Sequence, residues 1–181
     1  MTVAATGAFA QTQSTNRVGA NTDWSVFVED NPTECWSVTI PKETVNTRDG
    51  RVVAATRGDI LLMVFYQPSS NVKAQVTFTG GYPFRKDSTV NVNISGKEFK
   101  FFTEGEWAWP ATPADDSGLL AAMKAGSSAV VTGRSGRGTQ TKDTFSLQGF
   151  TAAMAEEALK PFSSHAVLEF DYLAEEGVFC G

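Results

Sequence analysis

The sequence predicts an all-β, mainly antiparallel fold with two short helices, arranged as a β-sandwich or a partly open barrel. About seven to nine short segments rich in Val, Ile, Thr, Phe and Trp recur at roughly ten-residue spacing. Gly, Pro, Asn and Asp, the residues typical of turns, separate these segments. Strands do not alternate with helices along the chain, which argues against a doubly wound α/β fold.

Alternation of apolar and polar residues indicates the individual strands. Trp24, Val26 and Val28 alternate with their neighbours, and Asn31-Pro32 supplies a turn that makes residues 23–40 a hairpin. Residues 59–67 are almost continuously apolar, so we expect a strand buried on both faces, with a short core helix as the alternative. The strands predicted in this way cover residues 23–29, 35–40, 59–67, 72–79, 89–94, 97–103, 107–109, 128–133 and 139–147.

Two segments show helical periodicity. Asp115, Asp116 and Ser117 are N-cap candidates for a helix that ends at Gly126, and its apolar residues are expected to pack on the sheet. These apolar residues are Leu119, Leu120 and Met123. Residues 150–159 predict a second helix, which Pro161 ends; the segment 165–173 fits either a strand or a helix.

Composition is typical of one globular domain: of 181 residues, 41% are hydrophobic and 19% charged. The net charge of −5 argues against a nucleic-acid partner, which requires a concentrated positive face. The longest apolar run in the β-rich region, Ile60 to Tyr66, is far shorter than the ~18 residues of a membrane-spanning helix. We therefore expect no transmembrane segment.

The N-terminus resembles the end of a signal peptide. Ala8-Phe9-Ala10 matches the A-x-A cleavage pattern and a polar run follows it. We interpret residues 1–21 as a disordered remnant of an export signal and leader; an unstructured Ala-rich terminus is the alternative. Residues 22–160 are expected to form the β-sandwich domain and residues 161–181 a C-terminal extension.

Two cysteines, Cys35 and Cys180, lie at opposite ends of the domain in a chain that we expect to be exported. We predict a disulfide between them; two free thiols are the alternative. A bridge closing so long a loop contributes about 4 to 5 kcal/mol in the chain-entropy treatment. With one histidine, His165, and no C-x-x-C or H-x-x-x-H spacing, we expect no metal and no cofactor.

The sequence does not predict an enzyme. The Gly-rich turn of residues 133–138 has no Lys for a phosphate-binding loop and has Arg137 where a nucleophile elbow needs glycine. His165 has no recognisable serine elbow to serve. Helix capping explains the carboxylates Asp115 and Asp116, and solubility at a strand boundary explains Glu104 and Glu106. We name no catalytic residues.

Two pairs of residues are candidates for binding a partner. Arg134 and Arg137 lie in the Gly-rich hairpin turn, where their guanidinium groups can hold a carboxylate or phosphate; the alternative is an internal pair between Arg137 and Asp143. Trp107 and Trp109 point to the same face of a strand, where they either stack on sugar rings or anchor a partner, or pack in the core.

The C-terminal half carries a combination of short motifs: Ala108-Trp109, Gly126, Ser135, Arg137-Gly138-Thr139, Asp143-Thr144, Ser146-Leu147 and Gly149-Phe150-Thr151-Ala152-Ala153. Upstream, Asp23-Trp24 is followed closely by Cys35. Together these residues resemble the invasion-associated locus B family of bacterial exported proteins, and the similarity spans residues 22–155.

The resemblance implies an immunoglobulin-like β-sandwich in a periplasmic or secreted, envelope-associated protein without established enzymatic activity. Members are linked in some pathogens to entry into host cells, so the expected function is binding of an envelope or host component. A carbohydrate-binding module that uses Trp107 and Trp109 is the alternative. Many members have two cysteines close together after the first Trp, whereas here Cys35 is followed only by the distant Cys180.

Overall fold

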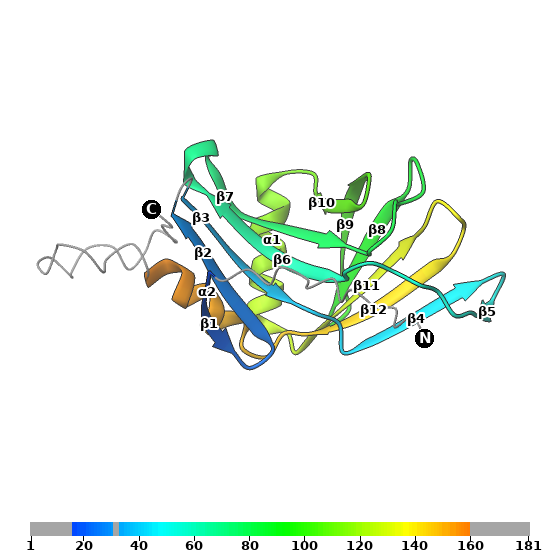
Figure 1. Ribbon diagram of the computed structural model, residues 1–181, viewed down its shortest axis with the longest axis horizontal. Helices are drawn as coiled ribbons and strands as arrows, with labels where there is room; N and C mark the ends of the chain where they lie inside the picture. Colours follow the sequence, from blue (N-terminus) through cyan, green and yellow to red (C-terminus); the bar gives the residue numbers. More distant parts are fainter. Residues whose placement is uncertain (1–15, 31–32, 160–181) are drawn as a thin grey trace, which may run out of the picture.

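The computed structural model describes residues 16–30 and 33–159, and within them twelve strands form one sheet accompanied by two α-helices (Figure 1). Along the sheet the strands follow the order β1-β2-β3-β6-β7-β10-β9-β8-β11-β12-β4-β5. Their bounds are β1 Arg17–Asn21, β2 Trp24–Asp30, β3 Thr33–Thr39, β4 Glu43–Arg48, β5 Arg51–Val52, β6 Leu61–Gln67, β7 Val72–Thr79, β8 Thr89–Ile94, β9 Lys97–Glu104, β10 Trp107–Pro110, β11 Ser128–Arg134 and β12 Gln140–Ser146. The 3-10 helix η1 covers Pro68–Ser70.

The sheet is rolled. A short chain connection and hydrogen bonds join its first strands to its last strands. β3 is third in the sheet and β4 is eleventh, yet only residues 40–42 connect them, so the sheet must curl back on itself. The Lys42 amide donates to the Thr144 carbonyl at 2.7 Å, and the Trp24 indole donates to the Ser146 carbonyl at 3.1 Å. These bonds tie β2 and the β3–β4 connection to β12.

The predicted all-β, mainly antiparallel class with two short helices is confirmed, because the strand pairs of this sheet are antiparallel. The immunoglobulin-like sandwich fits the way the two halves face each other. It is not confirmed, because the ladder runs without interruption from β1 to β5.

The core fills the inside of the rolled sheet with alternate side chains from each strand. In β6, Leu62, Val64 and Tyr66 are buried, whereas Met63 and Phe65 point outward and are half-buried. The expectation that this strand is buried on both faces is therefore wrong, because no second layer covers its outer face among the described residues. Phe78 and Phe145 meet edge to face in the middle of the core, with ring centroids 6.0 Å apart.

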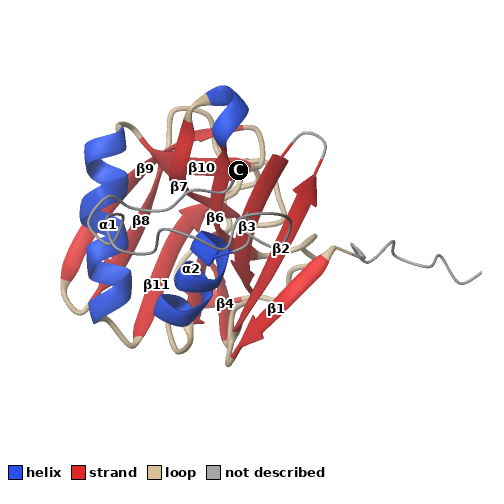
Figure 2. Cartoon of the chain, turned by 90° about the vertical axis from the view of Figure 1, so that its left-hand side faces the viewer, coloured by secondary structure: helices blue, strands red, loops and turns tan. Residues whose placement is uncertain are grey.

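Both α-helices lie at the same end of the rolled sheet (Figures 1 and 2). α1 (Pro113–Ala125) contacts β7, β9 and β10, and α2 (Phe150–Leu159) contacts β1, β2 and β3. Leu119 and Met123 of α1 are buried as expected, whereas Leu120 is only half-buried. The N-cap is Thr112 rather than one of the three predicted residues, and its hydroxyl accepts from the Asp115 amide at 3.3 Å.

The predicted leader extends too far into the chain. Arg17–Asn21 forms β1, which pairs with β2, so the disorder expected for residues 17–21 is wrong. The strands β4 and β5 are absent from the prediction, because their polar residues give little period-two contrast. The proposed export remnant in residues 1–15, the segment 165–173, His165 and Cys180 lie outside the described residues. Cys35 is buried in β3, and its bridge to Cys180 stays a prediction.

Candidate functional site

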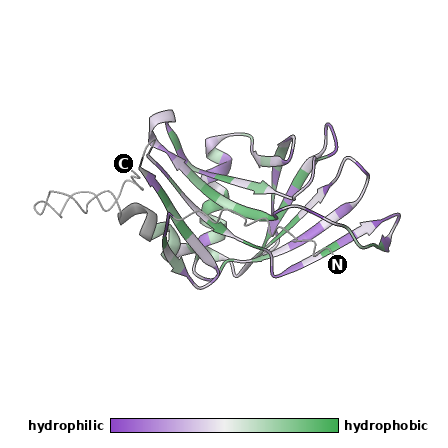
Figure 3. Ribbon diagram, in the orientation of Figure 1, coloured by the Kyte–Doolittle hydropathy of each residue, from purple (hydrophilic) through white to green (hydrophobic). Residues whose placement is uncertain are grey.

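Residues of β4, β12 and the neighbouring loops line a polar pocket of about 490 Å³. These strands extend to the end of the rolled sheet away from the helices (Figure 1). We call the cavity the mouth pocket; its walls include Arg48, Arg57, Tyr82, Arg137, Thr139 and Thr141. They come from β4, β12, the β7–β8 connection, the β11–β12 hairpin and the loop of residues 53–60. Hydrophilic residues predominate in β4 and at the β11–β12 tip, at this end of the molecule (Figure 3).

The polarity of the pocket follows from the sequence of β12. Its inward positions are Phe145, Asp143 and Thr141, followed by Thr139 just before the strand, and all four are at most 5% exposed. Asn46 of β4 lies opposite Thr141 in register. The interior of the rolled sheet therefore changes from apolar to polar along one strand, and the mouths of β-barrels are common ligand sites.

Arg57 supplies the counter-charge for the buried Asp143. Its Nη1 and Nη2 donate to Asp143 Oδ1 and Oδ2 at 2.7 and 2.6 Å, and its Nε donates to the Gly80 carbonyl at 2.8 Å. The two side chains are 5% and 0% exposed. This bidentate pair is electrically neutral, and it holds both oxygens of the carboxylate. Asp143 is thereby committed to structure rather than to proton transfer.

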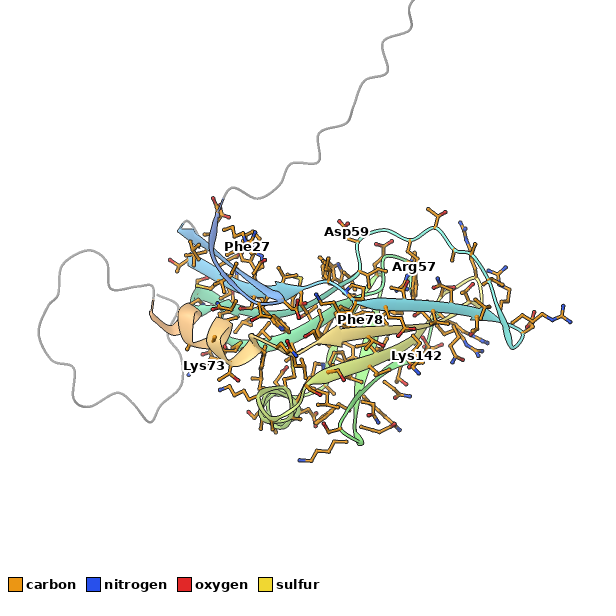
Figure 4. The ribbon with its side chains drawn as sticks, turned by 90° about the horizontal axis from the view of Figure 1, so that it is seen from below. Phe27, Arg57, Asp59, Lys73, Phe78 and Lys142 are labelled. Atoms are coloured by element: carbon orange, nitrogen blue, oxygen red, sulfur yellow. The ribbon has the colours of Figure 1, made fainter. Side chains whose placement is uncertain are left out.

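The loop that carries Arg57 is fixed to the β7–β8 connection. The Gly58 amide donates to the Gly81 carbonyl at 2.9 Å. Gly81 has φ +71°, and a Cβ there would lie 2.5 Å from the Gly58 oxygen, so only glycine allows this approach. In Figure 4 Arg57 lies between its loop and the strands, whereas Asp59 of the same loop lies at the periphery. The pocket wall is thus held in place before any ligand arrives.

Tyr82 forms a second wall beside Arg57. The Arg57 guanidinium lies 5.1 Å from the centre of the Tyr82 ring, and the Tyr82 hydroxyl is 2.6 Å from the Thr141 hydroxyl. Burial raises the pKa of the Tyr82 phenol above its ordinary value. A Cβ at Gly133 would lie 2.9 Å from the Tyr82 hydroxyl, so the glycine makes room for this ring.

Two further guanidinium groups line the pocket. Arg48 donates from Nη2 to the Thr139 hydroxyl at 2.7 Å, and Arg137 is exposed at the tip of the β11–β12 hairpin. Among the described residues, neither forms an ion pair. Glu106 is the one carboxylate among the lining residues, so Arg48 and Arg137 leave the pocket with an excess positive charge.

The structure separates the two arginines that the sequence grouped together. Arg137 lines the mouth pocket, whereas Arg134 is exposed at the end of β11 and is not part of the lining. The alternative pair between Arg137 and Asp143 is wrong, because Arg57 occupies both carboxylate oxygens. The hairpin tip is ordered by its own bonds: the Ser135 amide donates to Thr139 O at 2.9 Å, and the Thr139 amide donates to Ser135 Oγ at 3.1 Å.

Trp107 and Trp109 lie elsewhere, on the outer face of the sheet. With Met63, Phe65, Gln75 and Thr77 they line a hollow of about 320 Å³, which we call the outer hollow. Trp107 is 43% exposed, so core packing is wrong for this residue. Trp109 is half-buried and meets Phe102 edge to face, with ring centroids 4.5 Å apart.

The four carboxylates for which the sequence predicts no catalytic role lie in different parts of the fold. Asp115 lies in the first turn of α1, where it accepts from the Thr112 hydroxyl at 2.7 Å. Asp116 is 7% exposed and accepts from the Val76 amide at 2.8 Å; burial raises its pKa to about 6. Glu104 ends β9 and Glu106 lines the mouth pocket. They do not face one another across one cleft as a catalytic pair requires.

Sequence reasoning missed Arg48 and Arg57. One signal was available: the period of β12 places Asp143 on the same face as Phe145, and a buried carboxylate requires a buried cation. The sequence could not say which of its 15 Lys and Arg residues supplies it. In residues 16–30 and 33–159, no group of three His, Cys, Asp or Glu side chains is arranged to hold a metal ion. No helix in these ranges has the length and hydrophobicity to cross a membrane.

Comparison with known families agrees with the resemblance found in the sequence. Residues 24–158 match the family described as Invasion associated locus B (IalB) protein. No curated protein and no solved structure matches the chain. The match covers more than half of the 181 residues and includes Arg57, Arg137, Thr139 and Asp143. The chain belongs to the Invasion associated locus B (IalB) protein family.

Proposed function

We propose that the protein is a non-catalytic exported binding protein whose mouth pocket takes a small anionic group, a carboxylate or a phosphate, presented by an envelope or host component. Members of the family are generally exported, which places such components within reach. The observation that carries the proposal is the ion pairing of the three arginines that line the pocket. Arg57 is neutralised by Asp143, whereas Arg48 and Arg137 have no carboxylate partner among the described residues.

The pocket offers hydrogen bonds as well as charge. The hydroxyls of Ser135, Thr139 and Tyr82 line it, and guanidinium groups make charge-assisted, bidentate contacts with planar carboxylates and phosphates. The loop bond from Gly58 to Gly81 and the ordered hairpin tip hold these groups in place. Such pre-ordering reduces the entropy that binding must overcome.

The acidic residues near the mouth pocket also favour a binding role over a catalytic one. Asp143 is fully buried, does not line the pocket and accepts from Arg57 through both oxygens. Glu106 is exposed at the rim of the pocket. The contacts of the described residues show no second acid or base beside it. General acid and base catalysis requires a group poised for proton transfer against the reacting atom.

The proposal is tested by titrating the full chain with inorganic phosphate and with acetate at low ionic strength, following backbone amides by NMR. We expect the amides of residues 136–139 to shift, and the affinity to fall as salt is added. Because each charge-assisted contact contributes about 1.5 to 3 kcal/mol, Arg48→Ala/Arg137→Ala should weaken binding by about tenfold or more.

Arg134→Ala is the matched control, because Arg134 is exposed on the same hairpin but lies outside the pocket lining. It should change the affinity less than about twofold. Equal losses in the control and in the double variant would show that general positive charge, and not the mouth pocket, binds the anion. Unchanged spectra with both anions would overturn the proposal.

A further inference from the structure

We infer that the outer hollow binds a neutral glycan, at a site separate from the mouth pocket. The hollow is lined by Trp107 and Trp109 of β10, Met63 and Phe65 of β6, and Gln75 and Thr77 of β7. None of the six carries a charge, and two of them have side chains that both donate and accept hydrogen bonds. A pyranose presents an apolar C–H face and a polar edge of hydroxyls, which match an indole and an amide respectively.

The two indoles are presented by a rigid strand. β10 is paired with β7 on one side and with β9 on the other, so its backbone is fixed by both neighbours. Residues two apart in a strand point to the same face, which places Trp107 and Trp109 side by side. Trp109 is further oriented by its contact with Phe102, whereas Trp107 remains 43% exposed. One ring is therefore fixed, and the other keeps a free face.

The aromatic surface continues from the hollow across the sheet. Phe65 pairs with Trp36 of β3, and Trp36 pairs with Phe27 of β2, with the last two rings stacked at 5.5 Å. In Figure 4 Phe27 lies at the outer side of the sheet, away from the central Phe78. From β2 to β9 the sheet order gives five strand-to-strand steps of about 4.8 Å each. A band of this length suits several successive sugar rings laid across the strands.

Charge argues for a neutral occupant. A site for anionic lipid or an acidic polymer needs lysine or arginine, and the lining residues of the hollow include neither. Side chains of both signs flank the band: Glu34 accepts from the Gln67 amide and Glu104 pairs with Trp107 across the strands. Arg17 lies opposite Phe27, and Lys100 precedes Phe102 by two residues in β9. The flanking carboxylates can accept hydrogen bonds from sugar hydroxyls, and the lining of the hollow itself holds no charge that would select an ion.

The inference is tested by calorimetric titration of the full chain with three neutral hexasaccharides: cellohexaose, chitohexaose and maltohexaose. We expect at least one to bind with an affinity that added salt does not change. Exposed tryptophans at the centre of a binding site are typical hot spots, so Trp107→Ala should weaken binding by about tenfold or more, and Trp107→Phe should restore part of it. Gln75→Ala, which removes hydrogen bonds alone, should give a smaller loss.

Two control variants distinguish glycan binding in the outer hollow from binding elsewhere on the surface. Val52→Ala alters an exposed apolar residue of β5, 77% exposed, and should leave glycan binding unchanged. Arg48→Ala/Arg137→Ala should also leave it unchanged, since those residues belong to the mouth pocket. The inference fails if none of the three hexasaccharides binds, or if Trp107→Ala binds as tightly as the parent. It also fails if sedimentation shows that Trp107→Ala converts a dimer into a monomer, because the hollow would then join two copies of this chain.

Discussion

The pair of Arg57 and Asp143 shows how one residue contact decides the character of the candidate site. The two residues are 86 positions apart, and the fold aligns both guanidinium nitrogens with both carboxylate oxygens in a buried setting. Burying two charges costs solvation that their mutual attraction only roughly offsets. The pair is therefore better understood as a device that fixes the loop of residues 53–60 than as a large source of stability.

Removing one partner should be far more harmful than removing both. Arg57→Ala leaves Asp143 charged and unpaired inside the sheet, and we expect it to lower the free energy of unfolding by about 3 to 5 kcal/mol. Arg57→Met/Asp143→Leu removes both charges and should recover most of that loss. Urea unfolding followed by tryptophan fluorescence measures both. A single variant within about 1 kcal/mol of the parent would contradict the burial of this pair.

Among the elements, α1 and β7 share a contact that depends on pH. Asp116 of α1 accepts from the Val76 amide of β7, and its burial raises the pKa of the carboxyl to about 6, from an ordinary value of 3.8. Because Leu119 and Met123 anchor the same helix in the core, Asp116 cannot easily turn to solvent. The ionised carboxylate is thus less favourable in the folded protein than in the unfolded chain.

The sign of the pH dependence follows from this. Between pH 4 and pH 6 the folded protein keeps a proton on Asp116 that the unfolded chain has lost, so this group destabilises the fold as pH rises through the window. At about 1.4 kcal/mol for each pH unit between the two pKa values, acidification from pH 7 to pH 4 should relieve about 2 to 3 kcal/mol.

Asp116→Asn isolates the effect, because the amide oxygen can still accept from Val76 without a charge. We expect the variant to be more stable than the parent at pH 7 and equal to it near pH 4, as measured by urea midpoints at both values. Asp115→Asn, on the exposed side of the same turn, is the comparison variant: it should keep the pH dependence, shifted slightly to lower pH, because the charge of Asp115 adds to the raised pKa of Asp116. Parallel pH profiles for the parent and Asp116→Asn would refute the assignment.

At the scale of the whole molecule, the predicted bridge between Cys35 and Cys180 would tie the C-terminal extension to the sheet. Cys35 lies on the inner face of β3 and is 1% exposed, so its partner would have to enter the core. Mass spectrometry of the non-reduced protein decides the pairing. We expect a mass lower than that of the reduced chain by two hydrogen atoms, with no site for an alkylating reagent. Two alkylated cysteines in freshly purified, air-exposed protein would show that the thiols are free.

The mouth pocket and the outer hollow lie on different surfaces of one rolled sheet. The mouth pocket lies at the end of the interior, where inward positions become polar, and the outer hollow lies on the outside of β6, β7 and β10. Salt should weaken ligand binding at the first and leave binding at the second unchanged. The two proposals therefore succeed or fail independently.

The sequence by itself determined the strand class, most strand positions and both helices, because burial on one face of a strand imposes a period of two that local residues display. It also identified Arg137, Trp107 and Trp109 as candidate residues for binding a partner. Its motif Ser135 to Thr139 is accounted for by the hydrogen bonds of the hairpin tip, and Gly149 by its φ of +88°.

Only the tertiary structure decided which partners these residues have. A pattern shows that Asp143 faces inward, but the choice of Arg57 over Arg137 depends on how the loop of residues 53–60 returns to the sheet. Likewise, period two places Trp107 and Trp109 on one face, and the rolling of the sheet makes that face the outside. Local periodicity encodes that two faces differ, whereas curvature and long-range pairing decide which face encloses the core and which remains free to bind.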